Sequence, residues 1–295
     1  MINVFSKILN IFKSYRELKK IITKLNDIKL LNGKILAEIK KENNYLNPNE
    51  NEFKCFSQFG EDGIIQYLIN NINLSNKKFI EFGVENYEEA NTRFLLENDN
   101  WSGLIIDSSE NNINFIKKQD YYWKHEIRAV KSFIKVENIN QVIKDNKFEG
   151  KIGILSIDID GNDYWILKEI EVVTPDILIV EYNSLFGAKK SVTIKYKENY
   201  NRNNQKGVQK LIYGCSLAAL VNLCLQKGYS LVCTNSNGNN AFFVRNDLLN
   251  DKIKKIKVED AFHQNTFKEL FDDEKNPISL DSFEKVLKSD LIEEV

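Results

Sequence analysis

Two aspartates spaced for joint chemistry lie at the end of an apolar segment in the middle of the chain. Residues 152–159 are mostly apolar, and Asp158 and Asp160 stand at the end of this run. Along a β-strand alternate side chains point the same way, so the two carboxylates would share one side of the strand's end. Burying such a pair in an apolar setting is costly unless it has a partner or a task. We therefore expect Asp158 and Asp160 to be catalytic, with Asp160 as the stronger candidate for a general base.

Further oxygen-bearing side chains stand at the end of the next apolar segment, residues 176–182. Glu181 and Asn183 would lie beside Asp158 if the two segments are neighbouring strands. Carboxylate and amide oxygens suit a hard cation, so Asp158, Glu181 and Asn183 form a candidate Mg²⁺ site. The same groups could instead hold an ammonium group of a cofactor, or take a proton from a hydroxyl. Aspartates at this position can also simply cap the helix that follows.

The elements that would position these groups alternate between strands and helices. From residue 53 onward, short apolar runs separated by helical stretches predict a mostly parallel sheet covered on both faces, a Rossmann-like α/β fold. A helix over 217–227 is followed by two strands around the turn Asn237-Gly238-Asn239, which predicts a final antiparallel hairpin. Such a hairpin is typical of class I methyltransferases and is usually absent from a plain dinucleotide-binding domain. The predicted strands are 78–84, 103–107, 127–134, 152–159, 176–182, 229–234 and 241–245.

The ends of the first two predicted strands form the candidate cofactor site, because ligands of open α/β sheets bind beyond the carboxyl ends of the strands. The first strand ends at Glu81-Phe82-Gly83, where the glycine lets the backbone approach a ligand and the carboxylate can bind a cationic or hydroxyl-bearing group. The second ends at Asp107, followed by Ser108, and this carboxylate is placed to accept hydrogen bonds from both ribose hydroxyls of an adenosine. We expect these five residues to contact the cofactor.

The turn after the first strand discriminates between two classes of adenosine cofactor. NAD requires a glycine-rich turn, because its pyrophosphate lies against bare backbone at a helix N-terminus. Here Gly83 is the turn's single glycine, and Glu85, Glu88 and Glu89 follow it. Those carboxylates would repel a pyrophosphate, whereas S-adenosylmethionine has no phosphate and carries a sulfonium cation. The turn therefore favours S-adenosylmethionine over NAD.

Charge and cysteine content narrow the class of protein. The chain has 295 residues and a formal net charge of −1. Residues 1–34 carry eight Lys/Arg and two Asp/Glu, so the remaining chain is acidic and unsuited to nucleic acid. The four cysteines show no spacing suited to zinc and are expected to be inert core residues. The sequence shows no secretion signal and no long apolar run, so we expect a cytoplasmic protein.

The two ends of the chain are expected to be helical. Seven residues near the N-terminus follow a strict four-three spacing, which is the apolar seam of a coiled coil, and this register is lost beyond Leu25. They are Val4, Ile8, Ile11, Tyr15, Leu18, Ile22 and Leu25. We expect an amphipathic or coiled-coil-like helix over 1–45, a catalytic domain over 53–250 and a polar helical extension over 251–295. The first helix could pack on its own domain, join copies into a homo-oligomer or lie on a membrane surface. A basic stretch between residues 187 and 207, following the fifth strand, is a candidate lid over the site.

Several of these segments together resemble the FkbM-type methyltransferases of bacterial capsule and lipopolysaccharide biosynthesis, over about residues 53–250. The resemblance implies S-adenosylmethionine as cofactor, a sugar hydroxyl as acceptor, and nucleotide-linked sugars as one class of substrate. It implies that Gln58 lies near the cofactor's methionine end, that Glu81 and Asp107 bind the cofactor, and that Asp158 lies between cofactor and acceptor. Ser57 and Asn91, which belong to the matching segments, are also expected at the cofactor. The segments are 57–63 (SQFGEDG), 81–84 (EFGV), 91–93 (NTR), 158–164 (DIDGNDY), 181–183 (EYN) and 235–245 (NSNGNNAFFVR).

Two other functions stay open at this stage. An NAD-dependent oxidoreductase acting on nucleotide sugars would use the same fold, but the glycine-poor turn and the final hairpin disfavour it. A non-catalytic assembly module of a polysaccharide machine would use the N-terminal helix as its working part. Binding of S-adenosylmethionine against NAD separates the two enzymes, and deletion of residues 1–45 separates assembly from catalysis.

Overall fold

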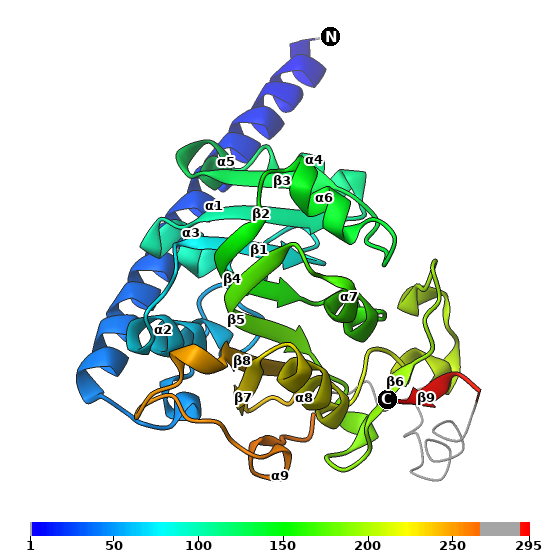
Figure 1. Ribbon diagram of the computed structural model, residues 1–295. Coiled ribbons are helices and arrows are strands. Elements are labelled where there is room, and N and C mark those ends of the chain that lie inside the picture. The colour runs from blue at the N-terminus through cyan, green and yellow to red at the C-terminus, as the bar shows by residue number, and fades with distance from the viewer. Residues whose placement is uncertain (1, 266–289) are drawn as a thin grey trace.

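A seven-stranded sheet forms the centre of the computed structural model, which describes residues 2–265 and 290–295 (Figure 1). The strands lie in the order β3-β2-β1-β4-β5-β8-β7. The first five run parallel, and β8 runs antiparallel to both of its neighbours. The predicted Rossmann-like class I methyltransferase sheet with its final hairpin is therefore confirmed. The strands are β1 Lys78–Phe82, β2 Ser102–Asp107, β3 Ile127–Lys131, β4 Gly150–Ile157, β5 Val173–Glu181, β7 Tyr229–Thr234 and β8 Asn240–Arg245.

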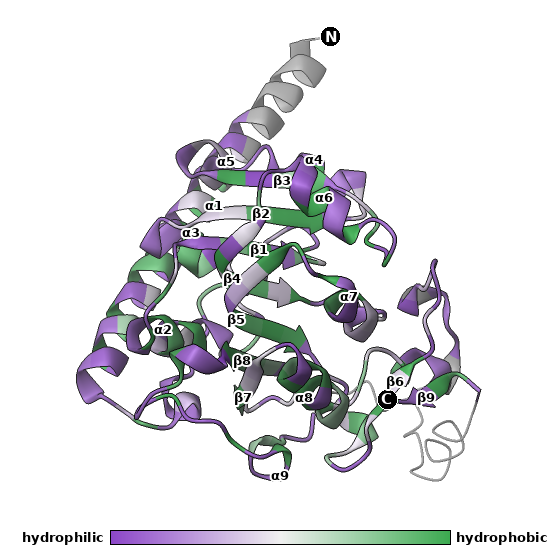
Figure 2. Cartoon of the chain, in the orientation of Figure 1, coloured by the Kyte–Doolittle hydropathy of each residue, from purple (hydrophilic) through white to green (hydrophobic). Residues whose placement is uncertain are grey.

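Helices cover both faces of this sheet, as continuous apolar strands require. Side chains from α6, α7 and α8 pack with one face, and side chains from α2, α3 and α4 pack with the other. Figure 2 shows β2 and β5 mostly green, with purple concentrated on the outer helices and loops. The helices are α1 Ile2–Asn43, α2 Glu61–Asn71, α3 Arg93–Asp99, α4 Glu110–Ile116, α5 Asp120–Lys124, α6 Ile139–Asp145, α7 Asp163–Glu169, α8 Leu217–Gln226 and α9 Val258–Ala261.

Three of the parallel strands end two or three residues earlier than the apolar pattern predicts. β1 ends at Phe82, and Gly83 turns away in a left-handed conformation (φ +72°). β4 ends at Ile157, because the backbone N–H of Ile159 donates to the side chain of Asp163 instead of to a neighbouring strand. β3 ends at Lys131, three residues before its predicted end. These early ends leave short loops at the carboxyl edge of the sheet.

A second, two-stranded sheet was missed by the sequence analysis. It pairs β6, Val192–Ile194, with β9, Ile292–Glu294, in antiparallel register. The predicted polar helical extension over 251–295 is wrong for the residues that are described there. Residues 290–295 contain β9, and residues 251–265 contain only the four-residue helix α9. Residues 266–289 lie outside the described part of the chain.

The predicted N-terminal helix is present as α1, which runs along one side of the domain and projects beyond it (Figure 1). It packs closely on the domain at Gly33, where an added Cβ would lie 2.7 Å from Phe94 and 2.8 Å from Cys55. Leu30 and Ala37 pack in the same small cluster. A glycine in mid-helix, normally unfavourable, is explained by this contact. Within the described residues, no helix is long and apolar enough to cross a membrane.

Candidate functional site

Two adjoining cavities at the carboxyl edge of the sheet form the candidate site. Their volumes are about 280 and 180 Å³, and both are lined by Gly83, Glu85, Asp158, Asp160 and Arg202. Because they share these residues, the two cavities are arms of one cleft. Its volume is in the range of ~300–1,000 Å³ that is usual for small-molecule sites. The cleft lies between the ends of β1 and β4, where the strand order reverses, and this is the expected ligand position in such a sheet.

The smaller arm lies at the end of β2, around Asp107. One carboxylate oxygen of Asp107 accepts from the backbone N–H of Glu85 at 2.9 Å. The other accepts from the N–H of Ser109 at 2.7 Å and from the side chain of Asn112 at 3.1 Å. These bonds fix the carboxylate at the cavity wall, where it is 8% exposed. Ser108 also lines this arm, as expected, and Phe133 contributes an exposed ring that the sequence analysis did not single out.

The larger arm lies at the end of β1 and is lined by Gln58, Phe82, Gly83 and Asn91. Only glycine fits the turn, since a Cβ at Gly83 would lie 1.6 Å from the carbonyl oxygen of Asp158. The β1 turn and the β4 turn are therefore in direct backbone contact. The sequence analysis expected these four residues at the cofactor site, and the structure brings them to one cavity.

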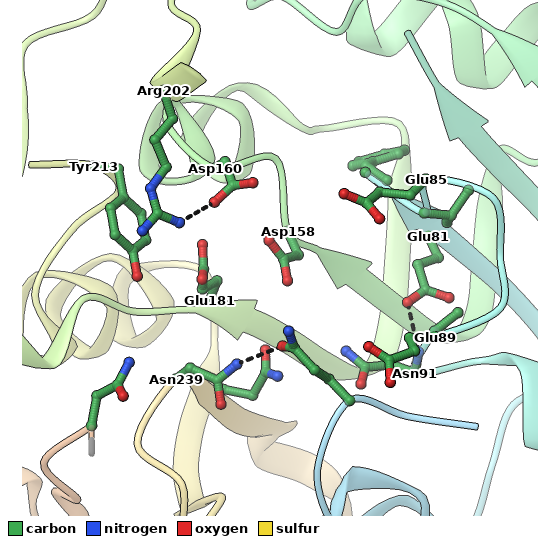
Figure 3. A pocket seen from close by; sticks show the side chains of 17 residues that line it. Glu81, Glu85, Glu89, Asn91, Asp158, Asp160, Glu181, Arg202, Tyr213 and Asn239 are labelled. Carbon is green, nitrogen blue, oxygen red and sulfur yellow. Dashed lines mark hydrogen bonds and ion pairs between the residues drawn. The ribbon is translucent and has the colours of Figure 1, made fainter. Parts of the chain in front are cut away.

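Glu81 lines the same arm, but its carboxylate is occupied (Figure 3). It accepts hydrogen bonds from the backbone N–H groups of Asn91 at 2.8 Å and Thr92 at 3.1 Å, and from the hydroxyl of Thr92. Burial is the main cause that raises the pKa of Glu81 to about 7. The structure therefore gives Glu81 a second task, which is to hold the loop that carries Asn91.

Ser57 is not part of the cleft, contrary to expectation. It is fully buried, and its hydroxyl donates to Asp62 at 2.9 Å. The same oxygen of Asp62 accepts from the backbone N–H groups of Cys55, Phe56 and Ser57, at 2.7 to 2.8 Å. Ser57 is thus placed to stabilise a turn, and only its neighbour Gln58 reaches the cavity. The sequence analysis missed Asp62, whose carboxylate accepts hydrogen bonds from all of these donors.

Asp158 and Glu181 meet in the middle of the cleft from the ends of β4 and β5 (Figure 3). Together with Asp163 they bring carboxylate oxygens within 4.8 Å of one another. Glu181 is 7% exposed, and its Oε2 is buried without a hydrogen-bond partner. Burial, followed by the neighbouring carboxylates, raises the pKa of both Asp158 and Glu181 well above the usual range. A hydrogen bond from Glu181 opposes this rise and lowers the pKa of Asp158.

The other two groups near this pair have structural tasks. Asp163 begins α7 and accepts from the backbone N–H of Ile159 at 2.8 Å and of Gly161 at 2.9 Å, so it closes the turn after β4. Asn183, expected as a metal ligand, does not line the cleft. Its amide nitrogen donates to the carbonyl oxygens of Leu211 at 2.8 Å and Tyr213 at 3.1 Å. Its amide oxygen caps the 3₁₀ helix Ser184–Phe186, so Asn183 is not placed to bind a metal ion.

Asp160 lines the cleft as expected, but it has a partner that the sequence analysis did not supply. Its Oδ1 lies 2.7 Å from Nη1 of Arg202, and the guanidinium of Arg202 stacks on the ring of Tyr213 with 3.8 Å to the centroid. Asp160 also adopts a left-handed backbone conformation, with φ +55°. Arg202 belongs to the basic stretch predicted as a lid, and this residue does extend over the cleft (Figure 3). The ion pair makes Asp160 the weaker candidate for a base and leaves Asp158 as the stronger one.

Comparisons with known proteins add only a general likeness of fold. No protein-family model and no curated protein sequence matches the chain. Among solved structures, the N-terminal domain of EvdMO1 with SAH bound is 13% identical with a TM-score of 0.41, over 70% of this chain and 94% of that one. A putative caffeoyl-CoA O-methyltransferase from Staphylococcus aureus is 17% identical with a TM-score of 0.42, over 73% and 99%. An O-methyltransferase from Bacillus cereus in complex with SAH is 13% identical with a TM-score of 0.38, over 72% and 88%. Likenesses at this level assign no substrate and no site residue to the chain.

Proposed function

We propose that this protein is an S-adenosylmethionine-dependent O-methyltransferase that acts on a sugar hydroxyl. The observation that carries the proposal is the acidic, glycine-poor cleft at the switch point of a class I methyltransferase sheet. Its wall includes Glu81, Glu85, Glu89, Asp158 and Glu181. Such a wall attracts a sulfonium cation and repels the pyrophosphate of NAD.

The two arms suit the two ends of this cofactor. In the smaller arm Asp107 presents a fixed carboxylate for the ribose hydroxyls, and Phe133 offers a ring for the adenine. In the larger arm Gln58 and Asn91 offer amide groups for the methionine end. The methyl group would then lie near Asp158, which lines both arms.

The remaining wall of the larger arm suits a polyhydroxylated acceptor. Beyond Asp158 it is formed by Arg202, Tyr213 and three asparagines, which offer both donors and acceptors to hydroxyl groups. The asparagines are Asn239, Asn240 and Asn265. A sugar linked to a nucleotide, destined for a capsule or another surface polysaccharide, is the acceptor that the FkbM-type resemblance implies. The overhanging Arg202 would then lie close to that acceptor.

The chemical step is a direct displacement at carbon. The acceptor hydroxyl loses its proton to the Asp158 carboxylate, its oxygen bonds to the methyl carbon, and the carbon–sulfur bond breaks. The electron pair of that bond stays on sulfur, so the products are a methyl ether and S-adenosylhomocysteine. Glu181 would hold a proton and donate a hydrogen bond to Asp158, which favours the charged form of Asp158. A sulfonium cation bound nearby would also lower the pKa of Asp158 and so favour its charged, basic form.

A metal-assisted version of the same reaction has one observation in its favour. The unpartnered Oε2 of Glu181 and the facing carboxylate of Asp158 could bind Mg²⁺, which often uses only one or two carboxylates and takes its other ligands from water and substrate. Bound there, the ion would supply polarisation of the acceptor hydroxyl. Titration of the protein with Mg²⁺ in a calorimeter, repeated with the Glu181→Gln variant, tests for this site without relying on turnover.

The proposed activity is tested by incubating the protein with S-adenosylmethionine and a panel of nucleotide sugars. We expect one sugar to gain the mass of a single CH₂ unit and S-adenosylhomocysteine to form in equal amount. The same panel with NAD in place of S-adenosylmethionine is the control for the oxidoreductase alternative. Reduction of NAD with no methylated product would contradict the proposal.

A further inference from the structure

Helix α1 carries a long apolar stripe that the domain does not cover. The stripe contains six apolar side chains, each between 45% and 58% exposed. In chain order they are Leu18, Ile21, Leu25, Ile28, Ile35 and Ile39. Asn32 is the one polar residue in the series. The series follows a three-four spacing, which is the a and d pattern of a coiled coil. The N-terminal seam passes through Ile22 and is lost beyond Leu25. The stripe uses Ile21 and Ile28 instead, one position earlier in the chain, and so continues to Ile39.

The stripe points away from the domain. The docked face of α1 is formed by Leu30, Gly33 and Ala37, which lie against Cys55 and Phe94. Ile28 and Leu30 are two positions apart and therefore point about 200° apart around the helix, and the same holds for Ile35 and Ala37. A second helix can thus lie along the stripe without displacing the domain. Over 22 residues, from Leu18 to Ile39, such a contact would extend for ~33 Å.

We propose that the stripe of α1 pairs in parallel and in register with the stripe of a second copy of this chain. In that arrangement Asn32 faces Asn32 of the second copy, and the two amides can hydrogen-bond to each other. In an antiparallel pair Asn32 would instead face one of the isoleucines and lose its partner, which is costly once the contact is dry. A lone asparagine at an a position is a known means of fixing register and oligomer state.

The charges on the polar face of α1 favour a protein partner over a membrane. Acidic Glu17, Asp27 and Glu38 are interspersed among exposed lysines such as Lys20 and Lys34, so this face carries both signs. An anionic lipid surface favours a helix whose polar face is uniformly basic. The polar face of α1, which carries both signs, lacks that uniformly basic character.

Two helices, not more, fit the way α1 is held. Leucine at a with isoleucine at d would by itself favour three or four helices. Here the domain occupies the face of Gly33 and Ala37, which leaves less of the α1 surface free for a third helix. The pair would also border a groove of about 800 Å³, because Leu18 and Ile22 line that groove together with Glu85 and Glu89 of the cleft wall. The second copy would thus stand next to the cleft, but the pairing does not depend on the proposed reaction.

Cysteine cross-linking of the full chain tests register and orientation. All four native cysteines are buried, so a new surface cysteine dominates oxidation. We expect Asn32→Cys to form a covalent dimer rapidly under mild oxidation, and Lys34→Cys, on the outer side of the same helix, to do so at least tenfold more slowly. Equal rates for the two variants would overturn the parallel, in-register pair.

The mass of the particle in sedimentation tests the pairing itself. We expect the native chain to sediment as a dimer, and Ile28→Lys to sediment as a monomer. Asp27→Lys, its neighbour on the outer face, changes the charge more but should leave the dimer intact. Because Ile28 is exposed, circular dichroism should show both variants folded. A monomeric or tetrameric native chain, or a monomer that binds phosphatidylserine vesicles through Ile28, would overturn the proposal.

Discussion

Two groups of carboxylates, one beside α2 and β1 and the other at the ends of β4 and β5, differ in their hydrogen-bond partners. On the side of α2 and β1, Glu61, Asp62 and Glu81 accept multiple hydrogen bonds from backbone or side-chain donors. At the ends of β4 and β5, Asp158 and Glu181 face each other, and one oxygen of Glu181 has no partner. The first group is surrounded by donors, and the second mainly by other acids.

This difference separates acids that hold the fold from acids available for chemistry. Burial raises the pKa of Asp62 to about 6 and that of Glu81 to about 7, while their N–H donors limit the rise. At Asp158 and Glu181 burial is reinforced by neighbouring carboxylates, and the pKa of each is raised well above its usual range. Strongly perturbed acids in a cleft are characteristic of functional sites. Substitution of one carboxylate from each group tests whether the first group stabilises the fold and the second takes part in the reaction.

The largest expected effect is on the chemical step, from Asp158→Asn. Loss of the proposed base should slow methyl transfer by about 10²–10⁴-fold, the usual contribution of general base catalysis. Single-turnover kinetics with a saturating acceptor measures this rate, and calorimetry should show that S-adenosylmethionine still binds. Asp160→Asn is the control, with a smaller expected loss because Asp160 is paired with Arg202. If Asp160→Asn is the slower enzyme, the two roles must be exchanged.

The corresponding effect in the other group is on stability, from Asp62→Ala. Removing the carboxylate leaves three buried backbone N–H groups and the Ser57 hydroxyl without their acceptor. We expect the free energy of unfolding to fall by at least about 4 kcal/mol, since each of the four unsatisfied buried groups costs about 1–3 kcal/mol. Urea denaturation measures the loss. Asp62→Asn keeps an acceptor oxygen and should lose much less. Equal losses in the two variants would show that the hydrogen bonds are not the cause.

A smaller effect is expected at the adenosine end, from Asp107→Ala. Loss of the proposed bonds to the ribose hydroxyls should weaken S-adenosylmethionine binding about 10- to 100-fold, since hydrogen bonds to a charged group contribute about 1.5–3 kcal/mol. Calorimetric titration measures the affinity. Asp107 also orders the turns at Glu85 and Ser109, so thermal unfolding of the variant should be recorded alongside. Unchanged affinity in a folded variant would remove Asp107 from the cofactor site.

The smallest effect is a shift in the pH dependence of turnover, from Glu181→Leu. Asp158 acts as a base only when deprotonated, so turnover should rise with pH through the pKa of Asp158. The hydrogen bond from Glu181 lowers that pKa, and its loss should move the rising limb to higher pH. Glu181→Gln can still donate a hydrogen bond and should leave the limb nearly in place. A limb that moves to lower pH in Glu181→Leu would mean that repulsion from Glu181 dominates.

Most of the sheet could be predicted from the sequence because its signals are local. Continuous apolar runs such as residues 176–182 and the Asn237-Gly238 turn depend on neighbours within a few positions. The pair of β6 and β9 could not be found this way, because each is three residues long and they lie far apart in the chain. The uncovered stripe on α1 was also hidden, since spacing alone does not say which face of a helix is docked.

The site was predicted in part, for a similar reason. Gly83, Asp107 and Asp158 follow strand ends directly, so topology alone carries them to the cleft. Arg202 was expected only as part of a basic lid over the site, and no sequence pattern predicted its ion pair with Asp160. Ser57 was misplaced because its hydroxyl donates to Asp62 at the start of α2, and no sequence pattern reveals this buried hydrogen bond.

The central claim is that the acidic cleft binds a sulfonium-bearing cofactor and not a dinucleotide. Calorimetric titration of the full chain with S-adenosylmethionine and, separately, with NAD tests it most directly. The account predicts saturable one-to-one binding of S-adenosylmethionine and no measurable binding of NAD. Tight binding of NAD, or no heat with S-adenosylmethionine from a folded protein, would contradict it.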